Sequence, residues 1–302
     1  GGGVEREGWA TIGEALDGDA AGEDGHDGGD AYAHALRLYA QHAADEALGR
    51  TCPHLSLEDY RLRPPVEVAF FDCDDCLYFD DWAVANQITR SIEKWCIEHA
   101  GLGPGDAYGL YKEHGTALRG LMETGLVGDG DGSTPTVERF LHDVHDLDPP
   151  VTDTLRPDAE LREMLRDMDP RIRKYVFTAS AREHAERCLE ALGISDQFVD
   201  IIDTRSCGLH TKHSPEAFRR AMECVGVNSQ EDDLLSCVFL DDSVKNIRTA
   251  KRVGWRSVLV GRKGRDDGEV VTAGGDAEHE VDRVHQLREI MPELFVAKEG
   301  CS

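Results

Sequence analysis

From Val66 onward, short apolar runs alternate along the chain with longer amphipathic segments of helical period. We predict that the apolar runs are buried strands at 66–71, 175–179, 198–202, 237–240 and 257–260. Helices are predicted between them, as at 181–192 and 214–225. This alternation is typical of a parallel sheet covered by helices on both faces. We therefore expect an α/β protein with a Rossmann-like parallel sheet, in which ligands bind at the carboxyl ends of the strands.

The interval between the first two predicted strands is much longer than a crossover connection requires. Helices are predicted within it at 82–100, 107–123, 136–145 and 158–168. We therefore predict a helical module at 81–169, inserted into a core made of 61–80 and 170–302. In that core, a polar loop at 262–280 is expected to precede a closing helix at 281–295. Residues 1–60 are predicted to form a disordered, acidic and glycine-rich tail with a short helix, because they offer little apolar area to bury.

Composition narrows the class of function. The 302 residues include 59 acidic and 33 basic ones, which gives a formal net charge of −26. A surface of this charge argues against nucleic acid as a partner. No run approaches the about 18 apolar residues of a membrane-spanning helix, so no membrane partner is expected. The nine cysteines are scattered and no signal peptide is visible, which favours a reducing, cytoplasmic location.

Four acidic residues follow two of the predicted strands directly. Asp72 and Asp74 come after the first strand, and Asp241 and Asp242 come after the strand at 237–240. Because the carboxyl ends of parallel strands meet at one edge, these carboxylates are expected to converge there. Carboxylates this close repel one another unless a cation lies among them. An oxygen-lined site that must also admit phosphate suits Mg²⁺.

The neighbouring polar residues suggest a division of catalytic roles. Asp72 is the candidate nucleophile, since a carboxylate can form an aspartyl-phosphate intermediate. Asp74 is the candidate general acid and base. Thr178 would bind a phosphate oxygen through its hydroxyl, and Lys212 would supply a point positive charge. Asp242 and Asn246 are expected to support this site.

The order Asp-x-Asp, Thr, Lys and Asp-Asp resembles the four motifs of the haloacid dehalogenase superfamily, over about residues 66–295. The resemblance implies a core of that fold with a C1-type cap inserted after the first motif. It also implies that Mg²⁺ is held by Asp72, by the main-chain carbonyl of Asp74 and by Asp241. The segments FFDCDDCLY, LYKEHGTALRGL, VFTAS, KHSPEAF and FLDDSVKNIRTAKRVGW resemble the pyrimidine 5′-nucleotidase branch.

Several residues near these motifs leave the substrate open. Ala179 stands where that branch often has Asn, which leaves one phosphate or substrate contact open, whereas the change to His213 from the usual Pro concerns only the loop. Ala179, Ser180 and Arg119 are candidate substrate-binding residues. Lys112 and Arg119 are equally compatible with a surface role.

Three further groups are better explained by packing or solvation than by chemistry. Cys73 and Cys76 have the spacing of a zinc or redox pair, but packing is favoured because no second close pair is present. His142 and His145 share a helix face that we expect to be solvated. The aromatic residues Trp82, Trp95 and Phe140 are expected in the core of the helical module.

The predicted reaction is Mg²⁺-dependent hydrolysis of a phosphomonoester through an Asp72 phosphoenzyme. The expected partner is a small phosphorylated metabolite, foremost a pyrimidine nucleoside 5′-monophosphate. Pyridoxal phosphate or a sugar phosphate is the alternative substrate. Other activities that the motifs leave open are those of a phosphomutase, a dehalogenase, or a non-catalytic regulatory or binding protein on the same fold. Asp74 argues against the dehalogenase.

Overall fold

The structure is a computed structural model that describes residues 66–128, 132, 134–227, 234–265 and 268–296. The chain divides into a unit at Gly1–Arg61 and a second unit at Leu62–Ser302. All described residues belong to the second unit. The tail predicted at 1–60 therefore lies outside the described residues.

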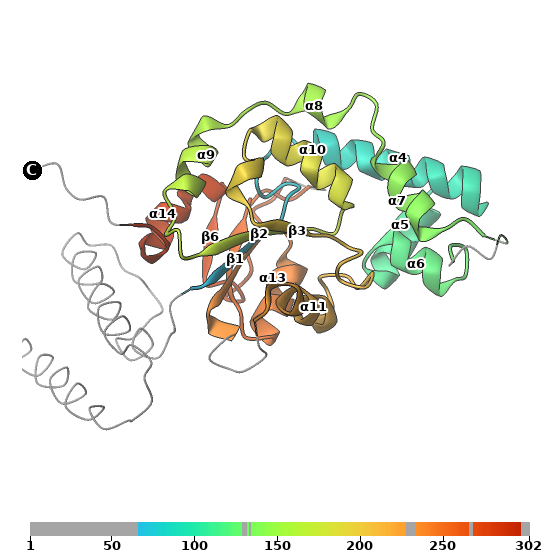
Figure 1. Cartoon of the computed structure of the whole chain (residues 1–302). Coiled ribbons are helices and arrows are strands. Elements are labelled where there is room, and N and C mark those ends of the chain that lie inside the picture. Colours follow the sequence, from blue (N-terminus) through green and yellow to red (C-terminus); the bar gives the residue numbers. More distant parts are fainter. Residues whose placement is uncertain (1–65, 129–131, 133, 228–233, 266–267, 297–302) are drawn as a thin grey trace, which may run out of the picture. The chain divides into compact units, whose positions relative to one another are not determined.

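A six-stranded sheet forms the centre of the second unit, and every neighbouring pair of its strands is parallel. The strand order is β3-β2-β1-β4-β5-β6 (Figure 1). The bounds are β1 (Val68–Phe71), β2 (Arg173–Phe177), β3 (Asp200–Ile202), β4 (Cys237–Asp241), β5 (Arg256–Val260) and β6 (His279–Val281). The predicted α/β fold class is confirmed, and each of the five predicted strands is present.

Successive side chains of β1 enter two different hydrophobic clusters, because neighbouring residues of a strand point to opposite faces. Phe71 packs in one cluster and Phe70 in the other. In Figure 1, helices α9 and α10 lie on one side of the sheet and α11 and α13 on the other. Their bounds are α9 (Ala159–Arg166), α10 (Arg182–Leu192), α11 (Pro215–Val225) and α13 (Val244–Arg252).

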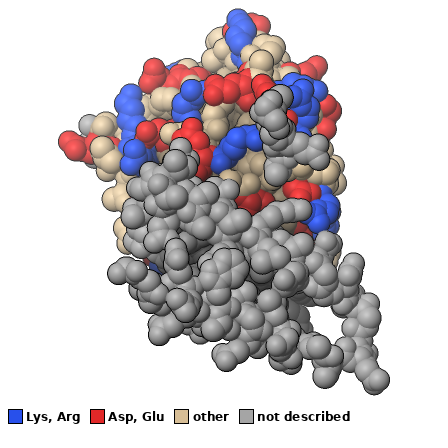
Figure 2. All heavy atoms as spheres, turned by 90° about the vertical axis from the view of Figure 1, so that its left-hand side faces the viewer, with Lys and Arg blue, Asp and Glu red and all other residues tan. Residues whose placement is uncertain are grey.

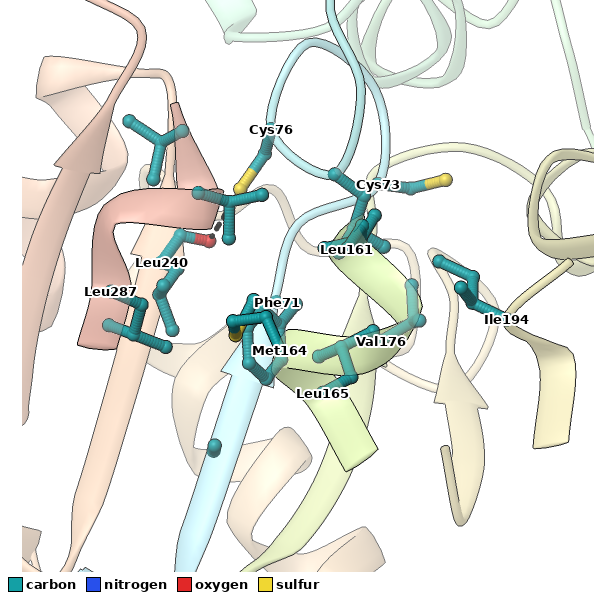
Figure 3. Packing of buried hydrophobic residues seen from close by; sticks show 14 of the residues in the cluster. Phe71, Cys73, Cys76, Leu161, Met164, Leu165, Val176, Ile194, Leu240 and Leu287 are labelled. Atoms are coloured by element: carbon teal, nitrogen blue, oxygen red, sulfur yellow. Dashed lines mark hydrogen bonds between the residues drawn. The ribbon is translucent and has the colours of Figure 1, made fainter. Parts of the chain in front are cut away.

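The cluster around Phe71 contains both cysteines of the Cys-x-x-Cys pair (Figure 3). The two thiols point to different places. The Cys76 thiol donates to the carbonyl of Leu240 at 3.5 Å, whereas Cys73 lies beside Cys188 of α10. The pair is therefore not arranged as two ligands of one ion.

The helical segment between β1 and β2 has a hydrophobic cluster of its own around Trp95, Leu121 and Phe140, which Ala181 of the core also joins. Trp82, in contrast, is only partly buried; it packs edge-on against Phe79 and lies under the ammonium of Lys263. The expectation that Trp82 is a core residue is wrong. The helices of this segment are α4 (Ala83–Ala100), α5 (Asp106–His114), α6 (Ala117–Glu123), α7 (Val137–His145) and α8 (Val151–Thr154).

Two predicted helices differ from the structure. The helix expected at 107–123 is divided at Gly115, whose φ of 86° is left-handed and ends α5. The closing helix expected at 281–295 is replaced by the end of β6 and by three short turns, η2 (Val284–Gln286), α14 (Leu287–Ile290) and η3 (Pro292–Leu294). Pro292 lacks the N–H that would continue a helix past Ile290.

The described surface carries charges of both signs. On the face drawn in Figure 2, basic and acidic side chains are interspersed outside the grey region. Among the described residues, no helix is long and apolar enough to cross a membrane.

Candidate active site

The central strands β1 and β4 bring the two acidic motifs together. The backbone N–H of Asp72 donates to the carbonyl of Leu240 at 2.9 Å, so pairing continues one residue beyond β1. Asp241 is the last residue of β4 and is fully buried. The same edge receives Thr178, which follows β2 and donates its N–H to the carbonyl of Ile202 at 3.0 Å.

Lys212 lies between two carboxylates. Its Nζ is 2.8 Å from Asp72 Oδ1 and 2.7 Å from Asp241 Oδ2, and it donates to the carbonyl of Phe177 at 3.0 Å. The side chain is only 4% exposed. Burial alone lowers the pKa of Lys212, but Asp241 and Asp72 together raise that pKa well above its ordinary value. The ammonium is therefore held charged inside the site.

The carboxylates of Asp72, Asp241 and Asp242 each offer an oxygen within 4.8 Å of the others. Burial raises the pKa of Asp72, the charges of Asp241 and Asp242 raise it further, and Lys212 opposes them. Asp242 therefore lies in the carboxylate cluster, as its position directly after the strand at 237–240 predicted.

The orientation of Asp241 is fixed by two donors. Asn246 Nδ2 donates to Asp241 Oδ1 at 2.9 Å, and the backbone N–H of Ser243 donates to the same oxygen at 2.8 Å. Asn246 is on the first turns of α13 and is buried. Its direct contact with Asp241 agrees with the supporting role expected for it.

The side chain of Asp74 is bound by three donors. Tyr78 donates its hydroxyl to Oδ1 at 2.6 Å and Ser180 donates to Oδ2 at 2.8 Å. His184 Nε2 lies 2.7 Å from Oδ1. Burial raises the pKa of Asp74, but the charge and hydrogen bond of His184, followed by the bonds from Tyr78 and Ser180, hold it well below its usual value.

His184 is a site residue that sequence reasoning missed. It lies on α10, its side chain is completely buried, and Asp74 raises its pKa to about 10 against the effect of burial. A histidine on the apolar face of a helix has no local signature of a role, since most such residues simply pack. Its spacing of four residues from Cys188 was the available signal.

The remaining candidates divide into two groups. The hydroxyl oxygen of Thr178 accepts the backbone N–H of Ser180 at 3.0 Å, so both residues belong to the turn beside Asp74. Ala179 is exposed between them. Arg119 donates from Nε to Glu123 at 2.6 Å within α6, and Lys112 Nζ lies 4.9 Å above the ring of Tyr108. The partner of Arg119 therefore lies within its own helix and not in the carboxylate cluster.

The turn that precedes α6 nevertheless lies against the loop of Lys212. A Cβ at Gly115 would be 2.7 Å from His213 Nδ1 and 3.3 Å from the hydroxyl oxygen of Thr211. The helical segment and the Lys212 loop are therefore packed closely at this point.

His142 and His145 do not share a solvated face. His142 is exposed and contacts Asp143 at 3.1 Å. His145 is buried, bonds the carbonyl of Leu141 at 2.8 Å, and its ring centroid is 5.2 Å from that of His184. The expectation of a solvated face is wrong for His145.

Comparison with known protein families identifies the family to which this chain is related. The family described as haloacid dehalogenase-like hydrolase matches residues 66–254. The chain belongs to the haloacid dehalogenase-like hydrolase family. This confirms the superfamily inferred from the four motifs, and it identifies the protein as a hydrolase of that family.

Relatives of this hydrolase include Phosphate metabolism protein 8 of Saccharomyces cerevisiae, which is 27% identical over 214 residues. The match covers 65% of this chain and 62% of the yeast protein, so the chain spans less than two thirds of that relative. Among solved structures, CbbY from Rhodobacter sphaeroides in complex with phosphate has a TM-score of 0.52 at 18% identity, covering 74% of this chain and 96% of that one. This likeness concerns the fold alone.

Proposed function

We propose that this hydrolase cleaves small phosphomonoesters with Mg²⁺ through an aspartyl-phosphate on Asp72. The observation that carries the proposal is the Lys212 ammonium, which lies within 2.8 Å of both the Asp72 and the Asp241 carboxylates at the ends of the central strands. A buried cation beside a carboxylate nucleophile offsets the charge of an approaching phosphate.

The residues at this edge fit a magnesium ion. Three carboxylates meet there around a single ammonium, and burial and mutual repulsion raise the pKa values of Asp72 and Asp242. A further hard cation would relieve this repulsion. Asp72 and Asp241 would hold Mg²⁺ with the main-chain carbonyl of Asp74, and Asp242 lies within the same group. When bound, the ion would neutralise charge on the phosphate and on the nucleophile.

In the first step, an Asp72 oxygen forms a bond to phosphorus while the ester P–O bond breaks, and the leaving oxygen takes a proton from Asp74. The donors around Asp74 favour its ionised form. A phosphate dianion placed beside it would raise the pKa of Asp74 again, because like charges favour protonation. In the second step, the ionised Asp74 accepts a proton from the water that hydrolyses the phosphoenzyme. Thr178 and its turn would bind a phosphate oxygen.

The cap was predicted at 81–169, but α9 packs on the sheet with the core. Helices α4 to α7, which share a hydrophobic cluster of their own, are therefore proposed to be the cap that closes over this site. The close packing of Gly115 against His213 and Thr211 supports a position beside Lys212. A closed cap would exclude water during transfer and would provide the substrate contacts. Arg119, Ser180 and the backbone at Ala179 remain our candidates for those contacts.

For the substrate we propose a pyrimidine nucleoside 5′-monophosphate, on the motif resemblance of the 70–78 segment. Pyridoxal phosphate and sugar phosphates are the alternatives. The name of the yeast relative refers to phosphate metabolism, which agrees with a phosphorylated substrate.

A phosphate-release screen with Mg²⁺ tests the proposal. The panel contains UMP, CMP, purine monophosphates, pyridoxal phosphate and sugar phosphates. Asp72→Asn should reduce the best turnover by at least about a thousandfold, since it removes the nucleophile, while circular dichroism stays unchanged. The matched control is Asp81→Asn, in the same region but exposed and paired with Lys263, which should retain activity. Phosphate release that survives in Asp72→Asn, or is absent from the wild-type protein with every ester, would refute the proposal.

A further inference from the structure

Beside the proposed catalytic edge lies a second group of metal-ligating side chains that the hydrolysis scheme does not use as ligands. Cys73 and Asp74 come from the loop after β1, and His184 and Cys188 come from α10. His184 and Cys188 are four residues apart on one helix, so both side chains reach the same face. Two elements therefore contribute two ligands each.

The ligand atoms of this group are already close. Cys73 Sγ, a carboxylate oxygen of Asp74 and Cys188 Sγ lie within 4.8 Å of one another. His184 Nε2 is 2.7 Å from Asp74 Oδ1 and 3.5 Å from Cys188 Sγ. In a tetrahedral zinc site, ligand atoms are roughly 3.3–3.8 Å apart, given metal–ligand distances of about 2.0–2.3 Å. His184 lies outside the group whose atoms are all within 4.8 Å of one another, so its ring and the more widely spaced ligand atoms would have to move towards the ion. The imidazole–carboxylate pair would have to separate by about half an ångström.

Burial and chemistry agree with a soft or borderline ion. Cys73, His184 and Cys188 are fully buried, and the Asp74 side chain is 19% exposed, which leaves one side open to solvent. Tyr78 and Ser180 donate to Asp74 and would orient its carboxylate, as outer partners do for metal ligands. Two thiolates and an imidazole select a Zn²⁺-like ion over Mg²⁺.

We propose that Cys73, Asp74, His184 and Cys188 form a binding site for Zn²⁺ that is separate from the carboxylate cluster of Asp72. On binding, the two thiol protons and the proton on His184 Nε2 pass to solvent, so that both sulfurs become thiolate ligands and the imidazole becomes a neutral ligand. Occupation takes the Asp74 carboxylate into coordination, so Zn²⁺ inhibits the enzyme without displacing Mg²⁺. Inhibition rests on the acid–base role proposed for Asp74, whereas binding does not.

Co²⁺ serves as the optical probe of this site. The full chain is titrated with Co²⁺ under reducing conditions and in excess Mg²⁺. The expected result is a near-ultraviolet thiolate-to-cobalt band, accompanied by visible bands of a tetrahedral ion, that one equivalent of Zn²⁺ abolishes. The carboxylate cluster has no sulfur ligand and cannot produce that band. Absence of the band from the wild-type protein overturns the proposal, and this measurement needs no variant.

A matched pair of cysteine variants tests whether the absorption band comes from the proposed zinc site. Cys188→Ser should lose it, whereas Cys207→Ser should keep it, because Cys207 is buried in the other cluster and bonds the carbonyl of Ala217. A band that persists in Cys188→Ser would overturn the assignment.

Turnover is measured separately. Zn²⁺ should inhibit wild-type and Cys207→Ser protein in excess Mg²⁺, and a chelator should reverse the inhibition. If the band is present but no ester is hydrolysed, the zinc site stands and the proposed phosphatase function fails. If the band forms and Zn²⁺ leaves turnover unchanged, the inhibitory role is wrong.

Discussion

At the scale of single residues, the orientation of Asp241 depends on one side-chain amide. Asn246 Nδ2 bonds Oδ1 of Asp241 at 2.9 Å, while Lys212 occupies the other oxygen. Both contacts are buried, so water does not replace them readily.

We expect Asn246→Ala to weaken the proposed Mg²⁺ site, because a carboxylate ligand without its orienting donor binds less well. The Mg²⁺ concentration at half-maximal turnover should rise by about 10–100-fold. Asn86→Ala is the control, since Asn86 is exposed and its side chain accepts a hydrogen bond from Arg265, away from the carboxylate cluster. An unchanged Mg²⁺ requirement in Asn246→Ala would show that the amide has no orienting role.

His145 makes stability depend on pH. Burial, with a contribution from the neighbouring His184, lowers the pKa of His145 to about 4. The unfolded chain protonates near its ordinary pKa of about 6.5, so between these values the unfolded state binds the extra proton. The contribution of neutral His145 is therefore complete above about pH 6.5 and is lost as the pH falls towards 4.

The free energy of unfolding should fall by about 2 kcal/mol between pH 7 and pH 5 from this residue alone. His145→Gln should flatten that part of the profile in urea denaturation. His142→Gln, at the exposed neighbouring histidine, should leave the slope as in the wild-type protein. Equal slopes for wild-type and His145→Gln protein would contradict the assignment.

At the scale of elements, aromatic rings pack against β1, the strand that directly precedes Asp72. The Trp255 ring stacks on Phe70 of β1 with centroids 4.4 Å apart and meets Phe218 of α11 edge-on at 4.9 Å. Trp255 is 4% exposed. Strand β1, helix α11 and the turn before β5 are thereby packed as one unit.

Trp255→Ala should lower the free energy of unfolding by about 3–5 kcal/mol, because it removes a large buried ring and leaves a cavity. Trp255→Phe is the informative comparison. Among the described residues Trp255 Nε1 has no hydrogen-bond partner, so Phe loses area but no hydrogen bond. We expect it to cost only about 1–2 kcal/mol. Similar losses for both variants would show that the ring stack contributes little.

At the scale of the whole described unit, Arg205 connects the helical segment to the core. It lies 2.9 Å from Glu138 of α7, 3.0 Å from Glu183 of α10 and 3.1 Å from Asp203 after β3. Glu138 is the member of this network that belongs to the proposed cap.

Glu138→Gln should loosen that connection. Hydrogen exchange should become faster in α7, while the melting temperature changes little, because exposed ion pairs contribute only about 0.2–1 kcal/mol. Glu98→Gln, which removes an exposed pair within α4, is the control and should leave exchange in α7 unchanged. Equal exchange of α7 in the wild-type protein and Glu138→Gln would argue against a connecting role.

Much of the fold could be predicted because it depends on local patterns. The apolar runs that became β1, β2, β4 and β5 are fully or largely buried strands whose hydrophobicity is visible in the sequence. The strand β6 was missed because three residues in a polar loop have no such pattern; they are a strand only because β5 offers them a partner. The closing helix predicted at 281–295 is absent from the structure, because Pro292 interrupts the helical pattern.

The proposed catalytic edge was predictable for a related reason. Asp72, Lys212 and Asp241 each follow an apolar strand or precede a helix, and parallel pairing brings strand ends to one place whatever the details of packing. The partners of Asp74 were not predictable in this way. His184 is 110 residues away in the sequence and reaches Asp74 only because α10 packs over the loop after β1. The hydrophobic period of each strand and helix is a local property of the sequence. Which side chains of two elements meet is decided only when those elements pack together in the tertiary structure.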